Sequence, residues 1–262
     1  MFHRKPKKKR FKPPKKPFRE RTISYVLEAV VCCALIVAFA RGAYVYAKHD
    51  PLFHLKTIRV AGSDRLQDDT IIRYSGITCE DNVLFLNPEE ARTRIARMPY
   101  VKACEVSRFF PDTVAIAVEE RVALATLMVG NRLFEVDDEC NVLRELLPDG
   151  LHVGPFITNV GDLGYVEPGQ RLVEPRLARA LAVWRAFSAT TMARDVTVSE
   201  ISAAQEGRIS MYCDELRCEI RWGRSNFEKQ AAKLDLFWQS QDRDIHCRDY
   251  VDLRFGNDVA CK

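Results

Sequence analysis

The sequence predicts an α+β protein anchored by a single transmembrane helix. Three observations lead to this fold class. A nearly unbroken apolar run follows a basic N-terminal segment, the next segment reads strand, helix, helix, strand, strand, and the remainder alternates apolar and polar residues in short runs with at least two amphipathic helices among them. We therefore expect a tail (1–21), a transmembrane helix (22–47), a small β-α-α-β-β module (52–121) and a mixed β-rich domain with two or more helices (122–262).

The tail carries most of the positive charge. It holds eleven Lys and Arg residues against one acidic residue, a net +10, while the whole chain is +4, so the remaining residues carry −6. Four prolines and almost no aliphatic side chains predict a disordered segment. The stretch KPKKKR alone would fit a nuclear signal or a nucleic-acid contact, but the acidic remainder does not favour nucleic-acid binding.

The apolar run from Thr22 to Ala40 indicates that the basic tail precedes a membrane-spanning helix rather than a nucleic-acid-binding domain. It extends with few interruptions to Ala47, and about 20 helical residues cross the hydrocarbon core of a bilayer. Arg41 can reach the interface, with Tyr44 and Tyr46 as an aromatic belt. Glu28 is costly inside the run, and two readings remain open: it lies near the headgroups or is neutralised, or it contacts a partner helix.

The basic tail in front of this helix predicts a cytoplasmic N-terminus and a body outside the cytoplasm. The stretch AFA at 38–40 resembles a signal-peptidase site. However, the apolar run continues past it and is longer than a usual signal sequence, which favours an uncleaved anchor.

The small module reads as two helices on one face of a mixed sheet. One strand covers HLKTIRVAG, and two more cover VKACEVSRF and TVAIAVEER, joined by the turn FPDT. We expect Asp64 to cap the first helix and Gly76 to end it. The second helix takes Asn87 as its cap and Pro88 at its first position.

The β-rich domain shows short strands around turns and two amphipathic helices. One helix covers EPRLARALAVWRAF, and the other covers SNFEKQAAKLDLFWQ with a capping box from Ser225 to Glu228. The three tryptophans and Met211 are expected in the core. The last strand is YVDLRF (250–255), which would place Val251 and Leu253 on the core face.

Seven cysteines lie outside the predicted membrane helix. Cys213 and Cys218 flank the turn DELR, so they would face each other across a hairpin. Two readings remain open for this pair: a disulfide, which such a separation permits, or two small buried thiols. The odd total leaves at least one cysteine unpaired within the chain, or paired with another chain.

No arrangement of residues predicts an enzyme. The sequence has no catalytic serine, zinc-protease or phosphate-loop motif. His246 and Cys247 together with Cys213 and Cys218 would supply zinc ligands in principle, but their spacing matches no common zinc motif. We expect no catalytic, cofactor-binding or metal-binding residues, no cofactor and no small-molecule substrate.

Several motifs carry a resemblance in a fixed order. They are a strand ending V-x-G, SGI after the first helix, N-x-L-F before the second, P-x-V entering a strand, and P-D-T-x-x-I-x-V-x-E-R in the last strand of the module. In this order, behind a basic tail and one anchor, the chain resembles the FtsQ/DivIB family of bacterial division proteins, and the module resembles their POTRA domain. The likeness is loosest between 140 and 205.

The resemblance implies a non-enzymatic scaffold of the division machinery in the inner membrane at the septum. Its partners would be FtsB-like and FtsL-like membrane proteins, with other division proteins on the POTRA module, and it would couple them to septal wall synthesis. The alternatives are a membrane-anchored periplasmic enzyme acting on the cell wall and a POTRA-containing secretion or assembly protein, although the latter carry repeated modules before a β-barrel.

The resemblance also implies a partner site on the last strand. A partner strand added to an open sheet edge would gain main-chain hydrogen bonds. The expected partner contacts are Tyr250, Asp252, Arg254, Phe255 and Gly256. An ordinary terminal strand with a surface ion pair is the alternative. The remaining stretch GNDVACK is shorter than the extension of many relatives, and Cys261 within it has no explanation at the sequence level.

Overall fold

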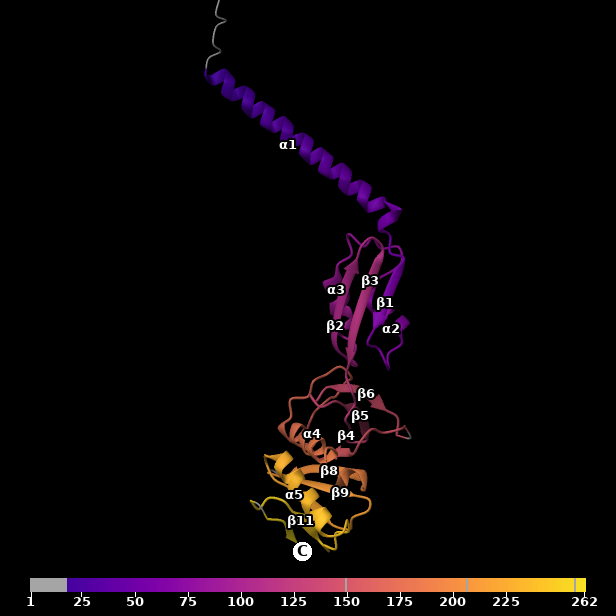
Figure 1. Cartoon of the computed structure of the whole chain (residues 1–262), viewed down its shortest axis with the longest axis vertical. Coiled ribbons are helices and arrows are strands. Elements are labelled where there is room, and N and C mark those ends of the chain that lie inside the picture. The colour runs from indigo at the N-terminus through magenta and orange to yellow at the C-terminus, as the bar shows by residue number, and fades with distance from the viewer. Residues whose placement is uncertain (1–17, 149, 206, 257) are drawn as a thin grey trace, which may run out of the picture.

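The computed structural model describes residues 18–148, 150–205, 207–256 and 258–262. A long helix, a small module and a larger domain follow one another along the molecule (Figure 1). Most of the predicted tail (1–21) lies outside the described residues. The predicted α+β class and the predicted order of parts are confirmed.

Helix α1 (Phe18–His49) is longer than the predicted span of 22–47. Its segment Tyr25–His49 is long and apolar enough to cross a membrane, and its side chains are not buried in the folded domains. A helix that projects away from the folded domains with exposed apolar side chains has the properties of a membrane anchor rather than of a core helix.

The small module contains the predicted three strands and two helices. A 3₁₀ turn (Pro51–Phe53) links it to α1, and its elements are β1 (Thr57–Ala61), α2 (Asp68–Ser75), α3 (Pro88–Ile95), β2 (Val101–Phe109) and β3 (Thr113–Glu120). The sheet order is β1-β3-β2, with β1 parallel and β2 antiparallel to β3. The two helices bury Ile71 and Ile95 against Val114 and Ile116 of the sheet.

The helix ends of the module match the sequence in part. Gly76 ends α2 in the left-handed conformation (φ 69°), and Asn87 accepts a hydrogen bond from the Glu89 N–H at 3.2 Å. The prediction that Asp64 caps α2 is wrong, because the helix begins at Asp68 after Gln67. The chain between β1 and α2 is held instead by Glu120, whose carboxylate accepts hydrogen bonds from the Arg65 N–H and the Leu66 N–H.

The larger domain is built on one nine-stranded sheet. Its strands are β4 (Ala125–Val129), β5 (Arg132–Val136), β6 (Val142–Leu146), β7 (Phe156–Thr158), β8 (Val198–Gln205), β9 (Arg208–Cys213), β10 (Glu219–Trp222), β11 (Tyr250–Asp252) and β12 (Ala260–Cys261). The order across the sheet is β12-β11-β10-β9-β8-β7-β4-β5-β6. The sheet therefore begins beside the small module at β6 and ends at the far tip of the molecule (Figure 1).

Helices α4 (Pro175–Ser188) and α5 (Phe227–Ser240) pack on this sheet, with a 3₁₀ turn (Met192–Arg194) after α4. Trp222 and Met211 are fully buried and Trp238 nearly so, as predicted, while Trp184 is only half-buried. The predicted capping box of α5 is wrong. Asn226 precedes the helix in the left-handed conformation (φ 58°) without a side-chain cap, and the carbonyl of Ser225 accepts a hydrogen bond from the Gln230 side chain.

A buried carboxylate joins the small module to the larger domain. The Glu135 side chain on β5 is fully buried; it accepts a hydrogen bond from the Tyr100 hydroxyl of the module and one from Arg144 Nη2 at 2.7 Å. Arg65 of the module adds an ion pair at 3.5 Å. Burial opposes ionisation of Glu135, but the bonds from Arg144 and Tyr100 outweigh it and lower its pKa. Burial, together with Glu135, raises the pKa of Tyr100 to about 12.

Candidate functional site

The predicted last strand lies inside the sheet rather than at its edge. Strand β11 (Tyr250–Asp252) pairs in parallel with β10 on one side and antiparallel with β12 on the other. The expectation that this strand forms the open edge is therefore wrong. It is also shorter than 250–255, because the Asp252 carboxylate accepts a hydrogen bond from the Arg254 N–H at 3.0 Å and the chain turns away from the ladder.

A disulfide fixes the strand that covers β11. Cys261 on β12 is bonded to Cys247, with a Cα–Cα distance of 5.5 Å. This bond explains the cysteine near the C-terminus that the sequence left unexplained. It also closes the loop of chain that contains β11, so β12 is tied to the strand it pairs with.

The alternative disulfide between Cys213 and Cys218 is not formed. Both are free thiols buried in the core of the domain, which was the second reading of this pair. Burial raises the pKa of Cys213 to about 12, and the nearby Glu215 carboxylate acts in the same direction. A thiol that stays protonated at neutral pH is a poor nucleophile, so this pair contributes packing rather than reactivity.

The outer edge of the sheet is formed by β12. Tyr250 and Lys262 exchange backbone hydrogen bonds, with Lys262 N to Tyr250 O at 3.1 Å and Tyr250 N to Lys262 O at 3.4 Å. Hydrogen-bonded and non-hydrogen-bonded pairs alternate along an antiparallel ladder. The next pair, Val251 and Cys261, is therefore not hydrogen-bonded. The N–H and C=O of Cys261 point away from β11, outward from the sheet.

An ammonium group from α5 holds the turn between β11 and β12. Lys233 Nζ lies 2.7 Å from the Leu253 carbonyl oxygen, 2.8 Å from that of Asp258, and within 3.4 Å of those of Phe255 and Gly256. Burial lowers the pKa of Lys233. Sequence reasoning missed this residue, because a lysine on a helix carries no signal that it will reach the carbonyls of a distant turn.

The predicted partner residues divide into buried and exposed ones. Val251 and Leu253 face the core, as predicted. Asp252 is 2 % exposed and is engaged by Arg254, with Nη2 to Oδ2 at 2.6 Å, so its carboxylate is not on the surface. Phe255 is 55 % exposed, and Gly256 beside it is exposed as well.

Tyr250 lies on the outer face of the sheet under a guanidinium group. Arg221 Cζ is 3.8 Å from the centre of the Tyr250 ring, and Arg221 Nε donates to Glu219 at 2.7 Å. Arg208 approaches the same Glu219 carboxylate at 3.7 Å. On this face, Arg221 and Arg208 both pair with Glu219, and Arg221 covers the Tyr250 ring. These contacts hold Tyr250 in a fixed position.

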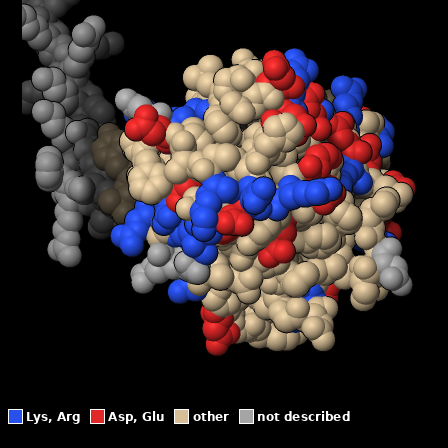
Figure 2. All heavy atoms as spheres, turned by 90° about the horizontal axis from the view of Figure 1, so that it is seen from below, with Lys and Arg blue, Asp and Glu red and all other residues tan. Residues whose placement is uncertain are grey.

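Figure 2 shows the C-terminal end of the molecule, with Lys and Arg side chains interleaved with Asp and Glu side chains. The ion pairs of this end include Arg254 with Asp252 and Lys262 with Asp249. A surface of mixed sign does not favour a polyanion such as nucleic acid, and it suits a protein partner with polar groups of both signs.

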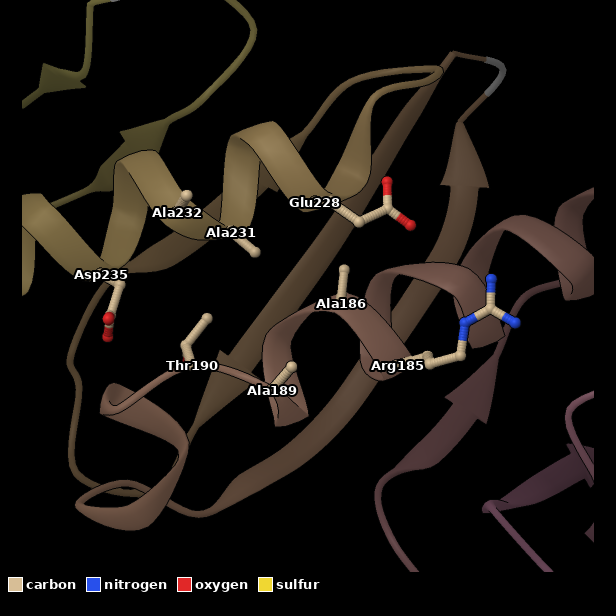
Figure 3. Close-up of a pocket in the computed structure, with 8 residues that line it drawn as sticks. All are labelled: Arg185, Ala186, Ala189, Thr190, Glu228, Ala231, Ala232 and Asp235. Atoms are coloured by element: carbon tan, nitrogen blue, oxygen red, sulfur yellow. The ribbon is translucent and has the colours of Figure 1, made fainter.

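A groove of about 440 Å³ lies between α4 and α5. Figure 3 shows alanine side chains of the two helices lining it, with Arg185 and Glu228 on one side and Asp235 on the other. Asp235 already accepts hydrogen bonds from Thr191 Oγ1 and the Met192 N–H, each at 2.8 Å. The groove marks the crossing of two helices and brings no nucleophile and base together.

The zinc site considered from the sequence is not assembled. Cys247 is disulfide-bonded, and His246 is exposed beside Asp244, at 3.7 Å. Among residues 18–262, apart from the three undescribed positions, no group of three His, Cys, Asp or Glu side chains is placed to hold a metal ion.

Comparisons with known proteins agree with this architecture. The sequence model of the FtsQ-type POTRA domain matches residues 53–121, and that of the C-terminal part of cell division protein FtsQ/DivIB matches residues 126–254. Cell division protein FtsQ of Anaeromyxobacter sp. (strain K) is 27 % identical over 215 residues, which cover 82 % of this chain and 72 % of the relative.

Two further relatives extend the comparison. Cell division protein FtsQ of Syntrophotalea carbinolica is 23 % identical over 89 % of this chain and 82 % of its own length. Cell division protein DivIB of Clostridium tetani is 29 % identical over 37 % of this chain and 37 % of its own length. With both parts of its extramembrane body matched in order behind one apolar helix, the chain belongs to the FtsQ/DivIB family of cell division proteins.

Proposed function

We propose that this protein is a non-enzymatic, single-pass scaffold of the division machinery in the bacterial inner membrane, located at the septum. Its N-terminus lies in the cytoplasm and its two folded parts lie outside. It recruits small FtsB-like and FtsL-like membrane proteins through the end of its sheet, offers the POTRA module to other division proteins, and couples them to septal wall synthesis. The observation that carries this proposal is the outward-facing edge of β12 at the tip farthest from α1.

Two features support the orientation in the membrane. Eleven Lys and Arg residues lie within residues 1–21, ahead of the apolar segment Tyr25–His49, and basic segments remain on the cytoplasmic side. The Cys247–Cys261 disulfide belongs to an oxidising compartment, as expected for a domain outside the cytoplasm. Labelling of the exposed Cys79 by a membrane-impermeant maleimide in spheroplasts tests this arrangement. Labelling only after lysis would reverse the proposed orientation.

Strand addition to β12 supplies the means of recruitment. The outward N–H and C=O of Cys261 offer one rung of a ladder to an extended segment of the partner. Phe255 provides an exposed apolar anchor in the turn between β11 and β12, with Gly256 leaving room for a close backbone approach. Tyr250 and Arg254 contribute polar contacts, and Asp252 acts indirectly by holding Arg254 in place.

Co-purification from membranes tests the site. We expect FtsB-like and FtsL-like proteins to accompany the tagged full-length chain, and Phe255→Asp to lose them and to lose division activity. Leu236→Asp is the matched control, because Leu236 is also exposed but lies on α5. Normal capture and normal division by Phe255→Asp would remove the proposed edge site. Consistent absence of such proteins with the unmodified chain would contradict the scaffold itself.

A further inference from the structure

The small module exposes a cluster of large apolar side chains at one end. We call this cluster the aromatic tip; it consists of Leu52, Phe85, Phe109 and Phe110, each between 42 % and 59 % exposed. They come from the 3₁₀ turn after α1, the loop before α3, the end of β2 and the turn between β2 and β3. Because β3 starts, and β2 ends, at the end of the module nearest α1, this turn lies on the side of the membrane helix (Figure 1).

The loop that carries Phe85 is attached directly to α1. Asn82 Nδ2 donates hydrogen bonds to the Ala47 carbonyl at 2.9 Å and the Lys48 carbonyl at 3.2 Å. The rings of Tyr44 and Phe85 meet edge to face, with centroids 4.9 Å apart. These contacts fix the loop against the last turns of the helix.

The Tyr44 contact sets the depth of the tip. Tyr44 lies five residues before the end of α1 at His49, and a helix rises about 1.5 Å per residue, so Tyr44 is roughly 7.5 Å from the helix end along the axis, on the side of the membrane-spanning segment. Tyr44 also belongs to the apolar segment Tyr25–His49. A ring packed on Tyr44 is therefore already at the level of the membrane interface.

The turn between β2 and β3 is held beside that loop. Arg108 Nη1 donates to the Leu84 carbonyl at 3.1 Å and to the Leu86 carbonyl at 3.2 Å, on either side of Phe85. The Arg108 guanidinium also lies over the Phe110 ring, with Cζ 5.9 Å from its centre. Phe109 and Phe110 thus cannot move away from Phe85 without breaking the Arg108 contacts.

A cluster of three exposed phenylalanines is uncommon on a surface that faces only water. Aromatic side chains favour the membrane interface, and cationic groups around them are attracted to anionic headgroups. Arg108 is exposed at the tip, and Lys48 occupies the last turn of α1. We propose that the aromatic tip inserts into the outer leaflet of the bilayer as a second membrane contact, so that the POTRA module lies on the lipid surface. This proposal rests on α1 crossing the bilayer.

Quenching by brominated lipids tests the contact in the full-length chain. The chain is reconstituted, without other proteins, in bilayers of phosphatidylethanolamine and phosphatidylglycerol. The acyl chains carry no bromine, bromine near the headgroup end, or bromine near the methyl end, so that both the interface and the bilayer centre are sampled. Phe110→Trp reports on the tip. Val122→Trp is the matched control, because Val122 is exposed just after β3, at the end of the module opposite the tip. Val37→Trp, in the middle of the apolar segment Tyr25–His49, reports on the span. The three natural tryptophans all lie in the larger domain and give a constant background.

We expect the added emission of Phe110→Trp to shift to the blue and to be lost in brominated bilayers, while that of Val122→Trp changes in neither respect. Equal quenching of these two variants, or quenching of neither while Val37→Trp is quenched, would overturn the proposal. If Val37→Trp is not quenched either, α1 does not span the bilayer, and the anchor itself is wrong. Because the bilayer contains no second protein, a tip that instead binds a partner helix would appear as the unquenched outcome.

Discussion

The hydroxyl of Tyr100 in the POTRA module donates a hydrogen bond to the carboxylate of Glu135 in the β-domain, and the Glu135 side chain is completely buried. Arg144 binds the other oxygen from the neighbouring strand β6. One carboxylate accepts hydrogen bonds from Tyr100 of the POTRA module and from Arg144 of the β-domain, two parts that have separate hydrophobic cores. This carboxylate therefore helps to hold the module against the sheet, beside the ion pair of Arg121 with Asp137 at 2.7 Å.

Replacing Glu135 by Gln should weaken this junction. The amide keeps one acceptor but loses the charge, so Arg144 and Arg65 lose their partner and a buried donor is left without an acceptor. We expect a loss of about 1–3 kcal/mol in the free energy of unfolding, measured by chemical denaturation of the purified chain. Glu145→Gln is the control, since it removes an exposed ion pair with Arg132, and we expect no change in stability. A Glu135→Gln chain as stable as the control would show that the junction does not depend on the charge.

The stabilising effect of Glu135 should depend on pH in a defined direction. Its pKa is lowered in the folded state, so its contribution is complete above the ordinary carboxyl value of about 4.3 and is lost as the pH falls through the folded pKa. The difference in unfolding free energy between the unmodified chain and Glu135→Gln should therefore shrink between pH 5 and pH 3. A constant difference over this range would contradict the assignment.

Tyr100 extends the same reasoning to alkaline pH. Its pKa is raised to about 12 in the folded state, so its contribution is complete below the ordinary tyrosine value of about 10 and is lost as the pH rises through about 12. Titration of tyrosine absorbance in the unmodified chain and in Tyr100→Phe should differ by one group that ionises near pH 12. If the missing group ionises near pH 10 instead, Tyr100 is not bonded to Glu135 in solution.

Removing the disulfide should release the edge strand. Cys247 and Cys261 are separated by 14 residues, and closing a loop of about this length contributes about 3 kcal/mol in the chain-entropy description. We expect Cys261→Ala to lower stability by about 2–3 kcal/mol and to speed amide exchange in β11. Cys79→Ser is the control, because that thiol is free and exposed. Unchanged exchange in β11 would mean that β12 holds its place without the bond.

The Lys233 contact can be tested separately from the disulfide. Lys233→Met keeps the length of the side chain but removes the ammonium group from four carbonyl oxygens, so residues 253–258 should exchange their amide hydrogens faster. Lys229→Met, an exposed lysine one turn earlier on the same helix, should leave this exchange unchanged. Equal protection in both variants would show that the turn is held by the disulfide alone.

The sequence predicted well where the pattern is local. The anchor is a run of neighbouring residues, Asn87 and Gly76 mark helix ends by their own chemistry, and Val251 and Leu253 follow the period of a strand. The predictions for Asp64 and Ser225 failed although each matched a cap motif, because contacts from Glu120 and a left-handed Asn226 decided those helix starts.

The edge of the sheet was beyond sequence reasoning. Strand β12 has two residues, too few for any periodicity, and its place depends on a disulfide and on Lys233 from α5. Cys213 and Cys218 have the spacing of a hairpin pair, whereas Cys247 and Cys261 have none that suggests pairing. Which cysteines meet is settled by the fold, and the nearer pair in sequence was the wrong one.

The sheet order also has a mechanical consequence. Nine strands spaced by about 4.8 Å separate β6 from β12 by roughly 38 Å along the sheet. The strand interfaces lie in series between these two strands, so a partner that pulls on β12 during constriction would pass the same tension through each of them to Arg144 and the POTRA module. The interface between β11 and β12 pairs only two residues of each strand, and in this chain that short interface is the one a covalent bond reinforces.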